Sequence, residues 1–214
     1  MKIIHKIVSV FEKNQNPACA EWHYAYMRRQ FPFLGIQKPL RKKLQTPFVK
    51  ELFSLHQNGD PIISALWTMP HREYQYLAMD VLSSHTLVEA DFPLLEWLIQ
   101  EKSWWDTVDL LASNHVGKLC KKSPSLIPKV DAWLTNQNLW LRRSALLYQL
   151  RYKQDTDEEC LFSSCLKLSG EKEFFIQKAI AWALREYAKT SPKSVNALLK
   201  KAHFRNLVLR EINR

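Results

Sequence analysis

Apolar residues recur every three or four positions along most of this chain, which is the spacing of helices with one buried face. The first such stretch contains Ile3, Ile7 and Phe11 and stops at Asn14. The chain has only 4 glycines in 214 residues, and no Asn-Gly or Asp-Gly pair joins alternating apolar runs. Signals for β-hairpins are therefore scarce, and the pattern predicts an all-α fold.

A second helix and an ordered connector are expected next. Asn16 followed by Pro17 is a combination that caps and begins a helix, which we expect to extend to Gln30. Aromatic and basic residues are interleaved in this helix, and they suit either half-buried packing or insertion against sugar and base. Segment 31–39 contains two prolines and Gly35, so it cannot continue the helix.

After this connector the chain repeats one pattern, an apolar helix that follows a short polar or proline break. The offsets between successive inner helices are 35, 31, 36 and 35 residues, and these helices are aligned at Pro39, Tyr74, Trp105, Leu141 and Ile176. The predicted outer helices are Phe48–Gln57, Phe92–Gln100, Ser125–Leu134 and Glu158–Leu168. Such a period predicts short HEAT-like repeats that form one α-solenoid domain over residues 1–214, with the inner helices on a concave face.

The charge of the chain indicates a polyanionic partner, because the net charge is +10 and the pI is near 9.5. Residues 22–50 and 187–210 contain no acid, and residues 118–153 contain only Asp131. Basic stretches that recur along a repeat protein predict a basic groove, as binding to a nucleic-acid backbone requires. A scaffold for protein partners would instead show an apolar groove with mixed charge.

Other function classes find little support in the sequence. The N-terminal apolar stretch is too short for a signal peptide or a membrane span, so we expect a cytoplasmic protein with no membrane partner. The four cysteines form no C-x-x-C pair, and the seven histidines show no ligand spacing. We therefore expect neither a metal site nor structural disulfides.

The segment SWWDTVD at 103–109 is the strongest candidate for a site. Helical phase places Trp104, Val108 and Leu111 on one buried stripe, while Trp105 and Asp109 share a different stripe. A large aromatic side chain beside an acid, with little else to pack on them, suggests a site. The alternative is ordinary packing next to an exposed charge.

The two acids of this segment differ in their predicted partners. Asp106 lies four residues after Lys102, which is the spacing of an exposed ion pair within a helix. Asp109 has no basic residue three or four positions away. It therefore requires water, a partner from another helix or a function.

Two later helices contribute further candidates. Trp182 lies off the apolar stripe of its helix between Lys178 and Arg185, so we expect it to be partly exposed and to face a ligand. Arg143 is less easily solvated than Arg142, and it suits either a salt bridge between repeats or a phosphate contact.

Together, these residues resemble the AlkD-type DNA glycosylases, a family built from HEAT-like repeats. The likeness spans nearly the whole chain, from NQNP near Asn16 and FLGIQ at 33–37, through SWWDTVD and YKQ, to EFFIQKAIAWALREYAK at 173–189. The resemblance implies that the lesion's deoxyribose is cradled by Trp105, Trp182 and Asp109. It also implies a phosphate contact for Arg143, a minor-groove contact for Tyr26 and a position close to the minor groove for Gln37. We expect Lys178 and Arg185 to contact DNA beside Trp182.

The activity implied by the resemblance is excision of N3- and N7-alkylated purines, such as 3-methyladenine and 7-methylguanine, from double-stranded DNA without base flipping. This is a step of base excision repair in the bacterial cytosol, by a monomer with no cofactor and no obligate protein partner. No lysine lies beside Trp105 and Asp109 within their own helix, so we expect a monofunctional enzyme. The alternative is a non-catalytic paralogue that binds distorted or branched DNA.

Overall fold

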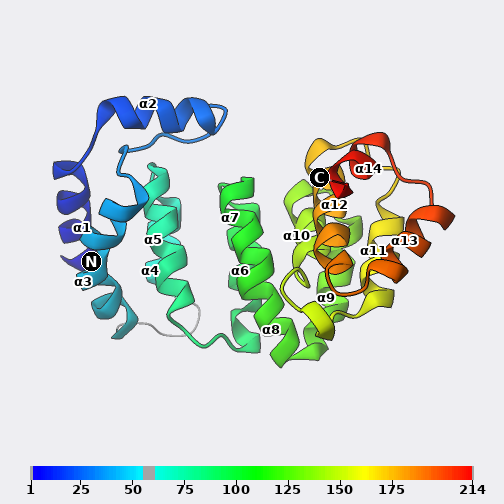
Figure 1. Ribbon diagram of the computed structural model, residues 1–214. Coiled ribbons are helices and arrows are strands. Elements are labelled where there is room, and N and C mark those ends of the chain that lie inside the picture. The colour runs from blue at the N-terminus through cyan, green and yellow to red at the C-terminus, as the bar shows by residue number, and fades with distance from the viewer. Residues whose placement is uncertain (1, 55–60, 214) are drawn as a thin grey trace. The chain divides into compact units, whose positions relative to one another are not determined.

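The computed structural model describes residues 2–54 and 61–213. These residues form helices joined by short connections and contain no β-strand, which confirms the all-α class. The chain divides into two compact units, Met1–Asp91 and Phe92–Arg214, and Figure 1 labels their helices in chain order. Within the described residues, no helix is both long enough and apolar enough to cross a membrane. The prediction of a single domain over residues 1–214 stays a prediction.

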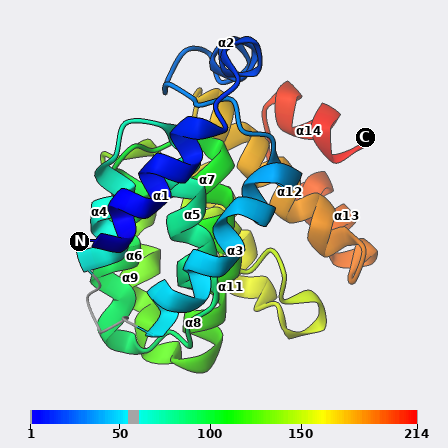
Figure 2. The same cartoon turned by 90° about the vertical axis from the view of Figure 1, so that its left-hand side faces the viewer.

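Unit 1 consists of helices around a small apolar core. Its elements are α1 (Lys2–Lys13), α2 (Pro17–Tyr26), α3 (Lys38–Ser54), α4 (Pro61–Thr68), α5 (Arg72–Ser83) and the short 3₁₀-helix η1 (Glu89–Asp91). The periodicity of α1 is confirmed, because Ile3, Ile7 and Phe11 are buried and Phe11 stacks on Tyr74 with ring centroids 5.6 Å apart. In Figures 1 and 2, α2 lies beyond the ends of α1, α3 and α5.

The N-terminal cap of α2 is confirmed, but its C-terminal end is earlier than predicted. The Oδ1 atom of Asn16 accepts a hydrogen bond from the Cys19 backbone N–H at 3.1 Å, and Pro17 is the first helical residue. The helix ends at Tyr26 rather than at Gln30, because Arg28 and Arg29 adopt left-handed backbone conformations with φ of 52° and 60°.

The first predicted helical pair is wrong. Residues 39–44 and 48–54 belong to one continuous helix, α3, with Pro47 in its interior, and residues 55–57 of the predicted outer helix lie outside the described residues. The helix continues because Pro47 removes a single backbone donor, while Leu52 beyond it is fully buried. Both α3 and α4 pack against α5, and the repeat alignment did not predict α4.

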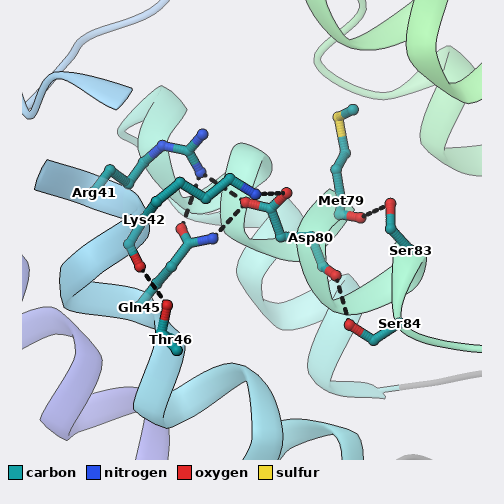
Figure 3. A network of polar contacts seen from close by, with 8 residues as sticks. All are labelled: Arg41, Lys42, Gln45, Thr46, Met79, Asp80, Ser83 and Ser84. Atoms are coloured by element: carbon teal, nitrogen blue, oxygen red, sulfur yellow. Dashed lines mark hydrogen bonds and ion pairs between the residues drawn. The ribbon is translucent and has the colours of Figure 1, made fainter. Parts of the chain in front are cut away.

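A polar cluster joins α3 to α5 (Figure 3). The Asp80 carboxylate accepts hydrogen bonds from Arg41 at 3.1 Å, from Lys42 at 2.6 Å and from Gln45. Burial alone would raise the pKa of the Asp80 carboxyl, but the hydrogen bonds from Lys42 and Gln45 and the nearby charges lower it. Part of the predicted basic surface is thus neutralised within the unit.

Unit 2 is assembled around α10. Its elements are α6 (Phe92–Gln100), α7 (Trp105–Leu110), the π-helix η2 (Leu111–Val116), α8 (Gly117–Lys122), η3 (Pro124–Leu126), α9 (Ile127–Ala132), η4 (Trp133–Thr135), α10 (Leu139–Leu147), η5 (Lys153–Asp155), α11 (Glu158–Lys167), α12 (Phe174–Ala188), α13 (Pro192–Lys201) and α14 (Asn206–Ile212). Helix α10 contacts α6, α7, η2, α11 and α12, and its Leu141 and Leu147 are fully buried. Burial of each such side chain stabilises the fold by about 1.5–3 kcal/mol.

The repeat alignment is more accurate in unit 2. The bounds of α6 are those predicted, and α11 ends one residue before the predicted Leu168. Helix α12 begins one residue later and ends two residues earlier than the predicted inner helix Glu173–Thr190. The predicted outer helix Ser125–Leu134 is divided into η3, α9 and η4. The inner helix predicted for WWDTVDLLA at 104–112 starts with α7 and continues through the π-helix into α8, so it extends ten residues beyond Ala112 to Lys122.

Candidate functional site

The site in unit 2 starts at the N-terminus of α7. Trp104 is the N-cap residue with extended backbone, and its ring packs against Trp140 and Phe175 at centroid distances of 5.5 and 5.2 Å. The prediction that Trp104 lies on the helix is therefore wrong, whereas the predicted burial of Val108 and Leu111 is confirmed. Packing of the Trp104 ring fixes where the helix begins and how it is rotated.

The prediction that Lys102 and Asp106 lie on one helix is wrong, and an ion pair between the two side chains stays a prediction. Lys102 precedes α7 and has a φ of 47°, so the two residues do not have the spacing of one helix turn. Asp106 lies in the first turn of α7, where the helix dipole stabilises a negative charge.

The partner of Asp109 is Arg143, which lies on another helix, α10. The Nε atom of Arg143 donates to Asp109 Oδ1 at 2.7 Å, and its Nη2 atom donates to Oδ2 at 2.8 Å. The remaining nitrogen, Nη1, donates to the backbone carbonyl of Phe175. The Arg143 side chain is 5% exposed and that of Asp109 is 15% exposed. The structure therefore shows the salt bridge between helices, and a phosphate contact of Arg143 stays a prediction.

A π-helical stretch directly follows this carboxylate. The backbone changes from α-helix to π-helix at Leu111, and the Ser113 hydroxyl donates to the Asp109 carbonyl at 2.7 Å. At the end of the stretch, Gly117 packs so tightly that an added Cβ would lie 2.2 Å from the Tyr148 carbonyl oxygen. Short π-helical stretches within longer helices are frequent at functional sites. This one changes the helical phase, so the side chains after Asp109 point in other directions than in a regular α-helix.

The electrostatics of Asp109 combine two opposing effects. Burial raises the pKa of the Asp109 carboxyl, while the hydrogen bonds and positive charge of Arg143 lower it and the charge of Asp106 raises it further. The net direction is upward from 3.8, because the group is largely removed from water. The folded state thus favours the protonated carboxyl more than the unfolded chain does.

A pH profile tests this shift. If ionised Asp109 is required, the single-turnover rate of base release should fall on acidification with a midpoint above 3.8. The contribution of Asp109 to the free energy of unfolding should rise as the pH falls from its folded-state pKa towards 3.8. The rate of base release by Asp109→Asn should not show this fall at acidic pH. A midpoint at or below 3.8, after correction for spontaneous base loss, would contradict the shift.

Asp109 borders a pocket of about 380 Å³ in unit 2. The residues that line it are Trp105, Asp109, Arg143, Phe174, Phe175, Lys178, Ala181, Trp182, Arg185 and Glu211. Trp105 and Trp182 are half-buried, which confirms the expected partial exposure of Trp182. The structure therefore brings both tryptophans and the carboxylate to one pocket, although they come from α7 and α12.

The two cations beside Trp182 are bound within the protein. The Lys178 ammonium lies 2.6 Å from Glu211 Oε2, and Arg185 Nη1 donates to the Glu211 backbone carbonyl at 2.8 Å. The side chain of Glu211 is 7% exposed and that of Lys178 is 34% exposed. Both cations thus attach α14 to α12. A DNA contact of Lys178 or Arg185 stays a prediction, and this geometry favours the structural role.

Lys178→Met distinguishes the two roles. We expect the variant to lose about 1–2 kcal/mol of stability, because the buried Glu211 carboxylate loses its ion pair with Lys178. The dependence of DNA affinity on salt should be unchanged. A decrease of about 0.9 in the slope of log affinity against log salt would instead show a phosphate contact. Lys189→Met is the matched control, because Lys189, the C-cap residue of α12, forms an exposed ion pair with Glu186.

The remaining predicted contacts belong to unit 1. Tyr26 on α2 is 58% exposed. Gln37 is exposed in the connector, and its Nε2 atom lies 3.9 Å from the Cys19 sulfur. Both side chains are accessible to a ligand, and their contacts with DNA stay predictions.

Sequence reasoning missed several residues of these surfaces. Phe174 and Phe175 line the pocket but were read as part of an apolar helix, and Glu211 lies on a helix that was not predicted. The signal for Glu211 in the sequence was its position as the isolated acid that follows the acid-free basic stretch 187–210. Among the described residues, no group of histidine, cysteine or acidic side chains has an arrangement that could hold a metal ion.

The helices and the pocket define an all-α protein in which two tryptophans and a carboxylate share one site. Comparison with known proteins identifies the class more closely. A family model described as DNA alkylation repair enzyme matches residues 7–211. A solved structure, described as a predicted DNA alkylation repair enzyme from Enterococcus faecalis, is 33% identical with a TM-score of 0.85 and covers 94% of this chain and 95% of its own. No curated protein sequence matches.

The chain belongs to the DNA alkylation repair enzyme family and has its AlkD-like helical fold. The resemblance found in the sequence is thereby confirmed. Membership of a DNA repair family implies a DNA substrate.

Proposed function

We propose that this protein is a DNA glycosylase that hydrolyses the N-glycosidic bond of N3- and N7-alkylated purines in duplex DNA. The observation that carries the proposal is the single pocket lined by Trp105, Trp182 and Asp109. Flat aromatic faces and a carboxylate are the groups that stabilise a sugar as positive charge develops on it. The basic exterior of the chain complements the phosphate backbone.

The proposed reaction requires little proton transfer at the base. A purine alkylated at N3 or N7 already carries a positive charge, so it leaves as a neutral base without prior protonation. The sugar then resembles an oxocarbenium ion. A water molecule adds to C1′ and loses a proton, which leaves an abasic site.

The pair with Arg143 is compatible with this role of Asp109. A carboxylate offers about four acceptor positions, and Arg143 occupies one on each oxygen. The remaining positions can accept a hydrogen bond from water or face the sugar. Arg143 meanwhile holds the carboxylate in one orientation, so little reorganisation is needed during the reaction.

Lys178 is a lysine in the pocket, and its state bears on the product. An amine must be unprotonated to attack C1′ and form a Schiff base, but this ammonium is paired with Glu211 at 2.6 Å. We therefore expect the abasic strand to remain intact. Borohydride should trap no enzyme–DNA adduct, whereas an adduct that disappears in Lys178→Met would show a lyase step.

Release of 7-methylguanine and 3-methyladenine from methylated duplex DNA, quantified by mass spectrometry, tests the proposal. The competing function is that of a non-catalytic paralogue, and the observation that favours it is that each Asp109 oxygen already accepts a hydrogen bond from Arg143. Such a protein would bind branched or distorted DNA without releasing either base. Release above the spontaneous rate, lost in Asp109→Asn, supports the glycosylase.

A further inference from the structure

Helix α2 in unit 1 presents an exposed pair of aromatic rings. Trp22 and Tyr26 are 63% and 58% exposed, and their rings stack with centroids 5.4 Å apart and an interplanar angle of 7°. No residue of α2 is buried, so this helix does not serve as a core element. Large aromatic side chains at such exposure are characteristic of binding surfaces.

The connector that follows α2 is held by a buried carboxylate. Glu73 on α5 is 1% exposed, and its Oε2 atom accepts a hydrogen bond from the Leu34 backbone N–H at 3.0 Å. Its Oε1 atom accepts from the N–H groups of Gly35 and Ile36 at 2.9 and 3.2 Å. Three backbone donors on one buried carboxylate fix the conformation of this connector, since each would otherwise be left without a partner.

The connector in turn holds the start of α2. The Asn16 backbone N–H donates to the Leu34 carbonyl at 2.8 Å. Gly35 has a φ of 79°, and an added Cβ would lie 2.1 Å from the Asn16 carbonyl oxygen and 2.5 Å from the Ala20 nitrogen. Only glycine fits this close approach of two backbones. Glu73 and Gly35 therefore help to position α2, together with the contact of His23 with the buried Phe33 and the buried C-cap residue Met27.

The charge around the ring pair indicates its partner. Residues 22–50 contain no acid, and the exposed Arg28 and Arg29 directly follow α2 in the chain. A surface that joins flat aromatic faces to neighbouring cations complements a nucleic acid, which offers base faces beside phosphates. An acidic protein surface would satisfy the cations but not the stacked rings.

We propose that the Trp22–Tyr26 ring pair is a base-contacting surface for duplex DNA and that Glu73 is the positioning residue that holds it in place. This inference rests on the proposed function for its choice of DNA. It goes beyond the expectation for Tyr26, because it adds Trp22 as a contact residue and identifies the carboxylate that orients both rings. The surface selects duplexes in which a base is unstacked, because a buried base offers no free face.

The first test measures binding to a duplex with a stable abasic-site analogue and to the matching intact duplex. Trp22→Ala should weaken binding to the abasic-analogue duplex about tenfold, or about 1.4 kcal/mol, with a smaller effect on the intact duplex. Trp22→Phe should restore most of the affinity, because a ring remains. Leu166→Ala is the control, since Leu166 is an exposed apolar residue of unit 2 at 42% exposure. Parental affinity in Trp22→Ala would overturn the proposal.

The second test addresses positioning. In Glu73→Gln, an amide N–H₂ replaces one acceptor oxygen and faces backbone donors, so the connector loosens. Affinity for the abasic-analogue duplex should fall about tenfold, while the rate of base release at saturating enzyme stays within about twofold of the parent. Gly35→Ala should likewise lower the affinity for DNA and leave the rate of base release nearly unchanged. Gly170→Ala should change neither quantity, because its added Cβ would meet nothing within 4 Å.

The outcomes separate the two proposals. A lower melting temperature in Glu73→Gln with parental DNA affinity would reduce Glu73 to a stabilising role and overturn the positioning inference. If the parent protein releases no alkylated base but Trp22→Ala still loses affinity, the proposed function fails and the DNA surface stands. Binding is measured without turnover, so neither result depends on the other.

Discussion

Asp109→Asn is expected to lower the single-turnover rate of 7-methylguanine release by about 10²–10³-fold. The substitution keeps the shape of the side chain and removes the charge that stabilises the sugar, and loss of one preorganised electrostatic group has an effect of this size. The change also places an amide N–H₂ against the Arg143 guanidinium, two donors face to face. We therefore expect a loss of stability as well, which a thermal melt records.

A double variant separates catalysis from stability. Asp109→Asn combined with Arg143→Met removes both charges of the pair, so no uncompensated charge remains buried, and stability should recover in part. The rate of base release should not recover. Asp106→Asn is the control on the same helix, because Asp106 lies in the first turn of α7 and does not line the pocket. Release near the parental rate in Asp109→Asn would rule out the assigned role.

Arg143→Met alone should give the largest loss of stability, about 3–5 kcal/mol. The Arg143 side chain is 5% exposed, and its removal leaves the Asp109 carboxylate and the Phe175 carbonyl without their donor. For a chain of this size, the loss corresponds to a fall in melting temperature of roughly 10 °C. Urea unfolding measures it directly.

Arg143→Lys sharpens this prediction. Lysine keeps the charge but cannot donate to both carboxylate oxygens and the carbonyl in one plane, so an intermediate loss of stability is expected. If Arg143→Met unfolds at the parental temperature but binds intact and lesioned duplexes equally weakly, the phosphate contact is the main role. Binding is compared below the melting temperature of the weaker variant.

Much of the local structure was predictable because it depends on neighbours in sequence. The cap at Asn16, the helix over Lys2–Lys13 and the bounds of α6 follow from residue type and spacing alone. The main failure has a tertiary cause. A separate outer helix was predicted from Phe48, whereas burial of Leu52 keeps α3 continuous through Pro47.

In the candidate site too, some features follow from the sequence and others only from the packing of helices. The sequence by itself determined an all-α repeat protein, its basic charge and the candidate site residues Trp105, Asp109 and Trp182, because composition and periodicity are properties of the chain. It left Asp109 without a partner and Arg143 with two alternatives. Only the tertiary structure decided that Asp109 pairs with Arg143, that Lys178 pairs with Glu211 and that three backbone donors meet on Glu73. Each of these contacts joins residues more than 30 positions apart, and their distances depend on how helices pack rather than on the sequence of any one helix.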